Sequence, residues 1–109
     1  MIIVQGYIEV NQTAQPMIHE LARNVVVATR AEPGCILYAI GTDVERPCRF
    51  LLGELWESDE ALTAHLASRH VDLFRTALRA LPDVVVVATK YEARNARPVT
   101  SQSGGALRG

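Results

Sequence analysis

The sequence changes its periodicity abruptly around Glu57, and this change restricts the folds that the chain can adopt. The segment Phe50–Trp56 alternates like a half-buried strand, whereas apolar residues recur at helical spacing from Ala61 onward. Ser58 stands between the two, where its hydroxyl can accept a hydrogen bond from the first helical turn. A strand therefore runs directly into a helix, so an aromatic side chain from the strand end and a histidine from the helix can face a common space.

Hydrophobic periodicity along the whole chain predicts seven elements in the order βαββααβ. Strands are expected over 2–10, 35–42, 48–57 and 84–92, and helices over 14–30, 58–68 and 71–81. Thr13 is the expected N-cap of the first helix, and Pro16 falls in its first turn. Pro82 ends the last helix. Gly53 lies in mid-strand, which predicts a bulge or a close backbone approach there.

This order is the α+β, ferredoxin-like layout, an antiparallel four-stranded sheet with helices on one face. The segments 35–40 and 84–88 are apolar on both faces, so the face without helices is expected to be apolar too. An exposed apolar sheet face is an association surface. The prediction is a homodimer, a dimeric α+β barrel in which two sheets pack face to face, with one pocket between each sheet and its own helices.

Length, charge and cysteine spacing exclude several classes of protein. The 109 residues allow one domain over 1–92, and 93–109 are expected to form a flexible tail or a partner-contacting arm. A net charge of -1 gives no reason to expect nucleic acid, and no apolar run approaches the ~20 residues that span a membrane. The start of the chain lacks a signal-peptide pattern, so a cytoplasmic location is expected. Cys35 and Cys48 lie too far apart along a hairpin for a disulfide and are expected to be free thiols.

Two stretches resemble the antibiotic biosynthesis monooxygenase family. Residues 54–58, Glu-Leu-Trp-Glu-Ser, followed by Ala64-His65-Leu66, Ser68, His70 and Phe74, fit its E-x-W-E-[SD] and A-H-x-x-[ST]-x-H-x-x-x-[FY] pattern. Residues 32–38 resemble its E-x-G-C-x-x-Y turn. The resemblance covers about residues 2–92. It implies a dimeric α+β barrel, and many such proteins are cofactor-free oxygenases that oxidise quinols or polycyclic phenols with O2.

The candidate site follows from what a cofactor-free oxygenase must do, which is to deprotonate a phenol, shield its anion and position it. His65 is the candidate catalytic base, because an imidazole titrates near pH ~6.5. Either tyrosine of the first two strands could orient a small aromatic substrate through its hydroxyl. The predicted substrate contacts are Trp56, Tyr38, Tyr7, Leu62, Phe74 and His70. No cofactor is expected.

The two histidines of the candidate site also have structural interpretations. His65 could instead hold the strand-to-helix junction, and His70 could serve as a helix cap or a packing residue. On one continuous helix these two histidines, five positions apart, would point about 140° away from each other, so no metal site is predicted. Glu54, if buried, needs a partner such as an arginine or a backbone donor.

Two other functions fit the same scaffold. The chain could be a non-catalytic dimeric barrel that binds a small apolar ligand, or an isomerase. The haem-degrading relatives carry an asparagine on the first strand that is lacking here, and no Gly-rich loop or basic cluster suggests a phosphate site. A fully packed interior would favour a binding protein, and an open pocket holding His65, Trp56 and a tyrosine hydroxyl would favour an enzyme.

Overall fold

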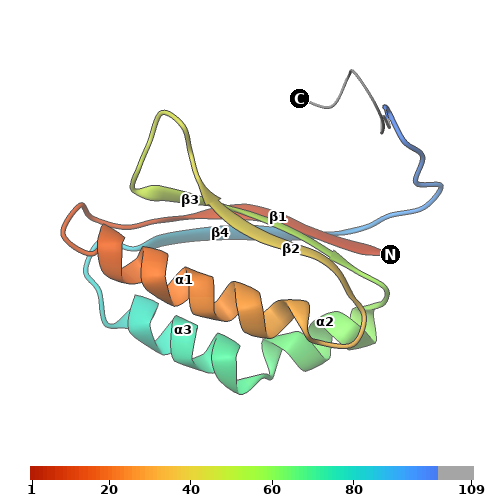
Figure 1. Cartoon of the computed structure of the whole chain (residues 1–109), viewed down its shortest axis with the longest axis horizontal. Helices are drawn as coiled ribbons and strands as arrows, with labels where there is room; N and C mark the ends of the chain where they lie inside the picture. The colour runs from red at the N-terminus through yellow and green to blue at the C-terminus, as the bar shows by residue number, and fades with distance from the viewer. Residues whose placement is uncertain (101–109) are drawn as a thin grey trace, which may run out of the picture.

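The computed structural model describes residues 1–100, which form the predicted ferredoxin-like α+β fold (Figure 1). Each strand boundary lies within one residue of its expected position. The elements are β1 Ile2–Glu9, α1 Gln15–Arg30, β2 Cys35–Thr42, β3 Arg49–Trp56, α2 Asp59–Leu66, α3 Arg69–Arg79 and β4 Val85–Glu92.

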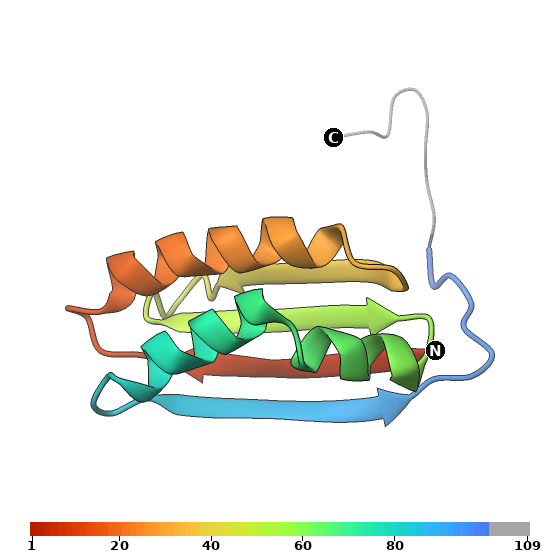
Figure 2. The same ribbon diagram turned by 90° about the horizontal axis from the view of Figure 1, so that it is seen from below.

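The four strands form one antiparallel sheet in the order β2-β3-β1-β4, and the helices lie on one side of it (Figures 1 and 2). The register pairs Ile2 with Trp56 and Ile8 with Phe50, and all four side chains are buried beneath the helices. Because side chains alternate along a strand, one residue in two faces this core. The helices leave β4 uncovered (Figure 2), and every residue of β4 is exposed.

The expected helix starts are confirmed at α2 and wrong at α1. The Ser58 hydroxyl accepts a 3.1 Å hydrogen bond from the Ala61 N–H, as predicted. At α1 the N-cap is Ala14 rather than Thr13, and the side chain of Asn11 accepts the Ala14 N–H at 2.8 Å. An Asx side chain competes well for a free N–H in a turn, and this chemistry favoured the asparagine over the threonine.

The close backbone approach expected at Gly53 occurs at Gly6 instead. A Cβ at Gly53 would meet no atom within 4 Å, and its pairing with Gln5 and Ala39 is regular. A Cβ at Gly6 would lie 1.8 Å from the carbonyl oxygen of Val87 on β4. Glycine at position 6 therefore lets β1 and β4 pair tightly.

The sheet face opposite the helices is apolar and uncovered, as expected. Its exposed large side chains include Leu37, Leu51, Val85, Val87 and Tyr91. We call this surface the open face. A polar group lies on this face at one end of the two central strands, where the Arg49 guanidinium lies 3.9 Å above the Tyr7 ring and forms a 2.6 Å ion pair with Glu9.

Several further expectations concern the termini and the cysteines. Residues 93–100 contain no helix or strand, and Ala93 donates a 2.8 Å hydrogen bond to the Met1 carbonyl. The remainder of the predicted tail lies outside the described residues. Cys35 and Cys48 are free thiols. Within residues 1–100, every helix is too short or too polar to cross a membrane.

Candidate functional site

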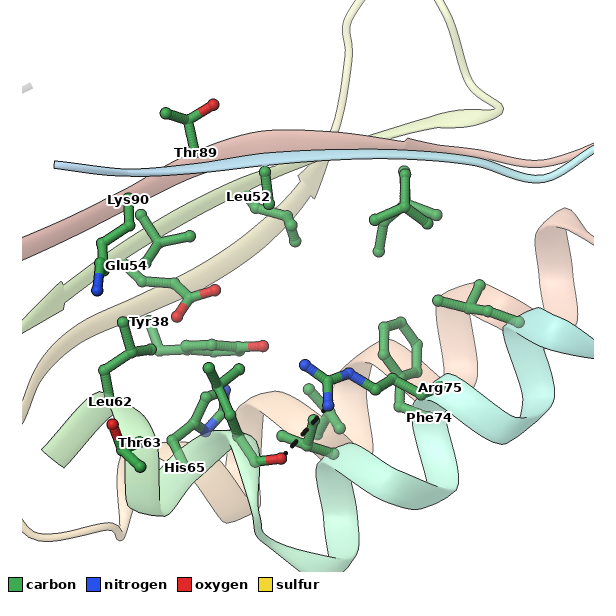
Figure 3. A pocket seen from close by; sticks show the side chains of 18 of the residues that line it. Tyr38, Leu52, Glu54, Leu62, Thr63, His65, Phe74, Arg75, Thr89 and Lys90 are labelled. Atoms are coloured by element: carbon green, nitrogen blue, oxygen red, sulfur yellow. Dashed lines mark hydrogen bonds between the residues drawn. The ribbon is translucent and has the colours of Figure 1, made fainter. Parts of the chain in front are cut away.

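A cavity of about 430 Å³ lies between the sheet and the helices α2 and α3 (Figure 3). Its walls are apolar for the most part, and the uncovered strand β4 contributes to them. The apolar lining includes Val4, Ile8, Leu52, Leu62, Phe74 and Val86; the polar lining includes Tyr38, Glu54, His65, Arg75 and Lys90. The volume suits a small aromatic molecule, because ligand pockets begin at about 300 Å³.

His65 lies at one end of this cavity and is held on three sides. Its side chain is buried, with the residue only 2% exposed. Its ring centroid lies 4.7 Å from that of Trp56 and 5.2 Å from that of Tyr38. Its Nδ1 lies 2.8 Å from Oε1 of Glu32. The contact with a carboxylate, which only accepts hydrogen bonds when ionised, assigns the proton to Nδ1.

The second ring nitrogen of His65 is therefore the reactive one. In the neutral ring with its proton on Nδ1, the lone pair is on Nε2. Nε2 has no hydrogen-bond partner among the described residues. Among those residues, Thr29 Oγ1 is the only fully buried side-chain polar atom that lacks a partner, so Nε2 is not fully buried. His65 is also one of the residues that line the cavity.

The turn before β2 brings Glu32 to His65. Gly34 in this turn has a φ of +83°, and a Cβ there would lie 2.6 Å from the Ala61 side chain on α2. Glycine is the residue that tolerates both the left-handed backbone and the close approach. From the sequence, Glu32 and Gly34 were predicted only to form the turn after the first helix. Their role in orienting His65 was not predicted.

His70 reaches the same carboxylate from the other side. Its Nε2 lies 2.5 Å from the Glu32 oxygen that accepts from His65. The predicted separation of these two histidines is wrong, because it assumed one continuous helix. The chain breaks after α2, where Ser68 caps the new helix α3, and this break turns His70 back toward His65, with ring centroids 6.0 Å apart.

Glu54 is buried beside this group with a partner that the sequence did not suggest. The Trp56 indole N–H, two residues along the same strand, donates a 2.9 Å hydrogen bond to Oε1 of Glu54. Burial raises the pKa of Glu54, while the Trp56 hydrogen bond and His65 lower it in part. Burial also raises the pKa of Tyr38, with Glu54 and Glu32 adding to the effect. Tyr38 therefore stays neutral and offers a hydroxyl.

Two cationic side chains from α3 and β4 complete the cavity wall (Figure 3). Lys90 pairs with Asp59 at 3.1 Å, and both side chains are half exposed. Arg75 forms a 3.4 Å hydrogen bond to the Leu66 carbonyl and has no carboxylate partner within residues 1–100. Neither cation was among the predicted site residues. Val4 pairs with Lys90 of β4, so the alternation that places Val4 on the helix side of the sheet places Lys90 there too. This pattern could have identified Lys90 from the sequence.

The structure brings some of the predicted site residues together and separates others. His65, Tyr38, Leu62 and Phe74 line the cavity. Trp56 is fully buried behind His65 and does not line it. His70 lies on the far side of the Glu32 carboxylate. Tyr7 lies on the open face beneath Arg49, away from the cavity.

Comparison with known proteins gives a family. A sequence profile described as antibiotic biosynthesis monooxygenase matches residues 1–77. A Deinococcus radiodurans structure provisionally described as an antibiotic biosynthesis monooxygenase is 31% identical, with a TM-score of 0.85 over 93% of this chain and 100% of its own. No curated protein matches the sequence.

Two more distant structures share the fold. A Nitrosomonas europaea protein with the same provisional description is 20% identical, with a TM-score of 0.80 over 85% of this chain and 98% of its own. A Mycobacterium tuberculosis protein is 23% identical, with a TM-score of 0.80 over 89% of this chain and 98% of its own. On the profile match and the Deinococcus likeness, the chain belongs to the antibiotic biosynthesis monooxygenase family.

Proposed function

We propose that this protein is a cytoplasmic monooxygenase that oxidises a small quinol or phenolic aromatic with O2 and needs no cofactor for that reaction. The observation that carries the proposal is the His65 imidazole, which Glu32 holds at Nδ1 while Nε2 is left free beside an apolar cavity. A base with one free nitrogen on the wall of such a cavity suits removal of a phenol proton.

The reaction needs little further chemistry from the protein. Once Nε2 of His65 takes the phenol proton, the electron-rich phenolate can transfer an electron to O2, and the two radicals can combine on the ring. In the complete oxidation of a quinol, one oxygen atom enters the ring as a hydroxyl and the other leaves as water. The substrate supplies all the electrons and leaves as a hydroxyquinone.

The other cavity residues support this assignment through their charge and polarity. The neutral Tyr38 hydroxyl can orient the substrate oxygen beside His65. Arg75, which has no carboxylate partner within the described chain, supplies positive charge to a cavity that would hold a phenolate. The apolar walls keep bulk water from the anion, which strengthens both interactions.

The same geometry leaves two other functions to be distinguished. An isomerase could use His65 to move a proton within its substrate, and a binding protein could hold an apolar ligand in the same space. The open cavity, with a base and a tyrosine hydroxyl at one end, favours an enzyme over a packed binding module. Consumption of O2 separates an oxygenase from an isomerase.

The first experiment measures O2 uptake by metal-free protein with a panel of reduced naphthoquinols and phenols. We expect uptake above the spontaneous rate, and we expect His65→Ala to lose about 10²- to 10⁴-fold of it, as is usual when a general base is removed. His19→Ala is the matched control, because His19 is exposed on α1 and does not line this cavity. Equal rates for wild type and His65→Ala would remove His65 from the mechanism, and no uptake with any substrate would reject the oxygenase.

We further propose that the active form is a homodimer that buries the open face. The support is the row of exposed apolar side chains on this face, which includes Leu51 at 43% exposure. Leu51→Glu should dissociate the dimer in sedimentation velocity, because it would bury an unpaired charge. Val27→Glu is the control, since Val27 is 73% exposed on α1, away from the sheet. A Leu51→Glu protein that stays dimeric would place the interface elsewhere.

A further inference from the structure

The oxygenase proposal uses the Glu32 carboxylate only to orient His65, and this leaves His70 without a role. Glu32, His65 and His70 come from the turn before β2, from α2 and from the start of α3. Their three potential ligand atoms all lie within 4.8 Å of one another. We propose that this Glu–His–His cluster is a binding site for a divalent transition-metal ion such as Zn²⁺, and that the bound ion prevents His65 from acting as a base.

The donor set suits such an ion. Two imidazole nitrogens with one carboxylate oxygen favour Zn²⁺, Co²⁺ or Fe²⁺ over Mg²⁺ and Ca²⁺, which prefer oxygen ligands alone. Three protein ligands leave at least one coordination position for water, as in the three-ligand zinc sites. The distances of 2.8 and 2.5 Å from the shared Glu32 oxygen to the two histidines show that all three groups already converge on one point.

The cluster can open to admit an ion. Tetrahedral ligands at about 2.0–2.2 Å from Zn²⁺ lie roughly 3.3 Å apart, so the Glu32 oxygen must move away from each nitrogen by somewhat less than about 1 Å. His65 is buried and fixed between Trp56 and Tyr38. The side chain of His70 is 25% exposed and that of Glu32 is 14% exposed, so these two can shift and leave a route for the ion.

The bound ion and the free base exclude each other. In the free protein, Nδ1 of His65 donates its proton to Glu32, and Nε2 carries the free lone pair on a residue that lines the cavity. A metal ion takes a lone pair, so binding at Nδ1 moves the remaining proton of the neutral ring to Nε2. His65 then has no acceptor for a substrate proton. This consequence rests on the proposed function, whereas the metal site itself does not.

The test titrates the full-length, chelator-treated protein with Zn²⁺ and with Co²⁺ by calorimetry. We expect one ion per chain, and we expect His70→Asn and Glu32→Gln each to weaken binding at least 10-fold. His19→Asn, which removes the one histidine outside the cluster, is the control and should bind like the wild type. Cys35→Ser should bind normally too, and a thiolate band in the Co²⁺ spectrum would reveal a cysteine site instead.

Two results would overturn the site: no stoichiometric binding by the wild type, or unchanged affinity in both His70→Asn and Glu32→Gln. Circular dichroism of each variant checks that it is folded. In the activity arm, each protein is compared with its own metal-free rate, and we expect saturating Zn²⁺ to slow the wild type at least 10-fold and to spare His70→Asn. Activation by the ion would keep the site and reject the cofactor-free mechanism, whereas absence of any O2 uptake would reject the oxygenase and leave the calorimetry to decide the site.

Discussion

The two faces of the sheet are made by the same strands, yet they have opposite characters. On the helix side, alternate residues of β1 and β3 are buried beneath the helices, and polar groups such as Glu54 and His65 are buried with partners. On the open face, apolar side chains are exposed, and the polar contacts of Tyr7, Glu9 and Arg49 lie at one end of the two central strands. Helices of the same chain cover much of the helix side, whereas the apolar side chains of the open face are exposed, as in the association surface proposed above.

Neighbouring residues on β3 give the largest test of this contrast. Phe50 is 1% exposed beneath the helices, and Leu51 is 43% exposed on the open face. Phe50→Ala should lower the free energy of unfolding by about 3–5 kcal/mol at every protein concentration, since it leaves a cavity in the core. Leu51→Ala should act through dimer dissociation, so its effect should shrink on dilution. Urea unfolding at several concentrations measures both, and equal, concentration-independent losses would contradict the contrast.

Two of the strand glycines, Gly6 and Gly53, give a second test, with a smaller effect. Gly6→Ala puts a methyl group 1.8 Å from the Val87 carbonyl oxygen and should destabilise the β1–β4 pairing by at least about 2 kcal/mol. Gly53→Ala meets no atom within 4 Å in the single chain. We expect Gly53→Ala to keep the thermal stability of the monomer while weakening the dimer in sedimentation. A thermal midpoint that falls equally in both variants would refute this assignment.

The buried carboxylate on the helix side gives the smallest effect, and it depends on pH. Burial raises the pKa of Glu54 in the folded protein. As the pH rises above the ordinary value of about 4.3, the unfolded chain loses this proton first, so the folded state loses stability until the folded carboxyl ionises as well.

Glu54→Gln should remove this decline, because the Gln amide oxygen can still accept the Trp56 N–H but cannot ionise. At neutral pH we expect the variant to have a higher free energy of unfolding than the wild type. Urea midpoints between pH 4 and 8, at one protein concentration, measure the difference. Parallel pH profiles for the two proteins would show that Glu54 does not cause the decline.

Local patterns were enough to predict the elements of this fold. Alternation identified the strands, and Ser58 and the prolines marked where helices begin and end, because capping and proline sterics act over a few residues. Local patterns failed where two nearby side chains could accept a hydrogen bond from the same helix start. At the start of α1 it chose Thr13, whereas the side chain of Asn11 accepts the free N–H.

The candidate site was predictable only in part. His65, Tyr38, Leu62 and Phe74 were correctly grouped around one cavity, because each follows from the face of its own element. Tyr7 was grouped with them although its strand position puts it on the open face. Glu32 was missed as a partner of His65, since nothing in the local pattern says which turn will lie against α2.

The sequence by itself determined the order of elements, the apolar character of both sheet faces and the position of His65 next to the strand end. These follow from periodicity and from the chemistry of single residues. Only the tertiary structure decided that Glu32, 33 positions before His65, holds Nδ1, and that the break after α2 brings His70 to the same oxygen. Contacts between distant segments depend on how helices and turns pack over the sheet, and no local pattern contains that information.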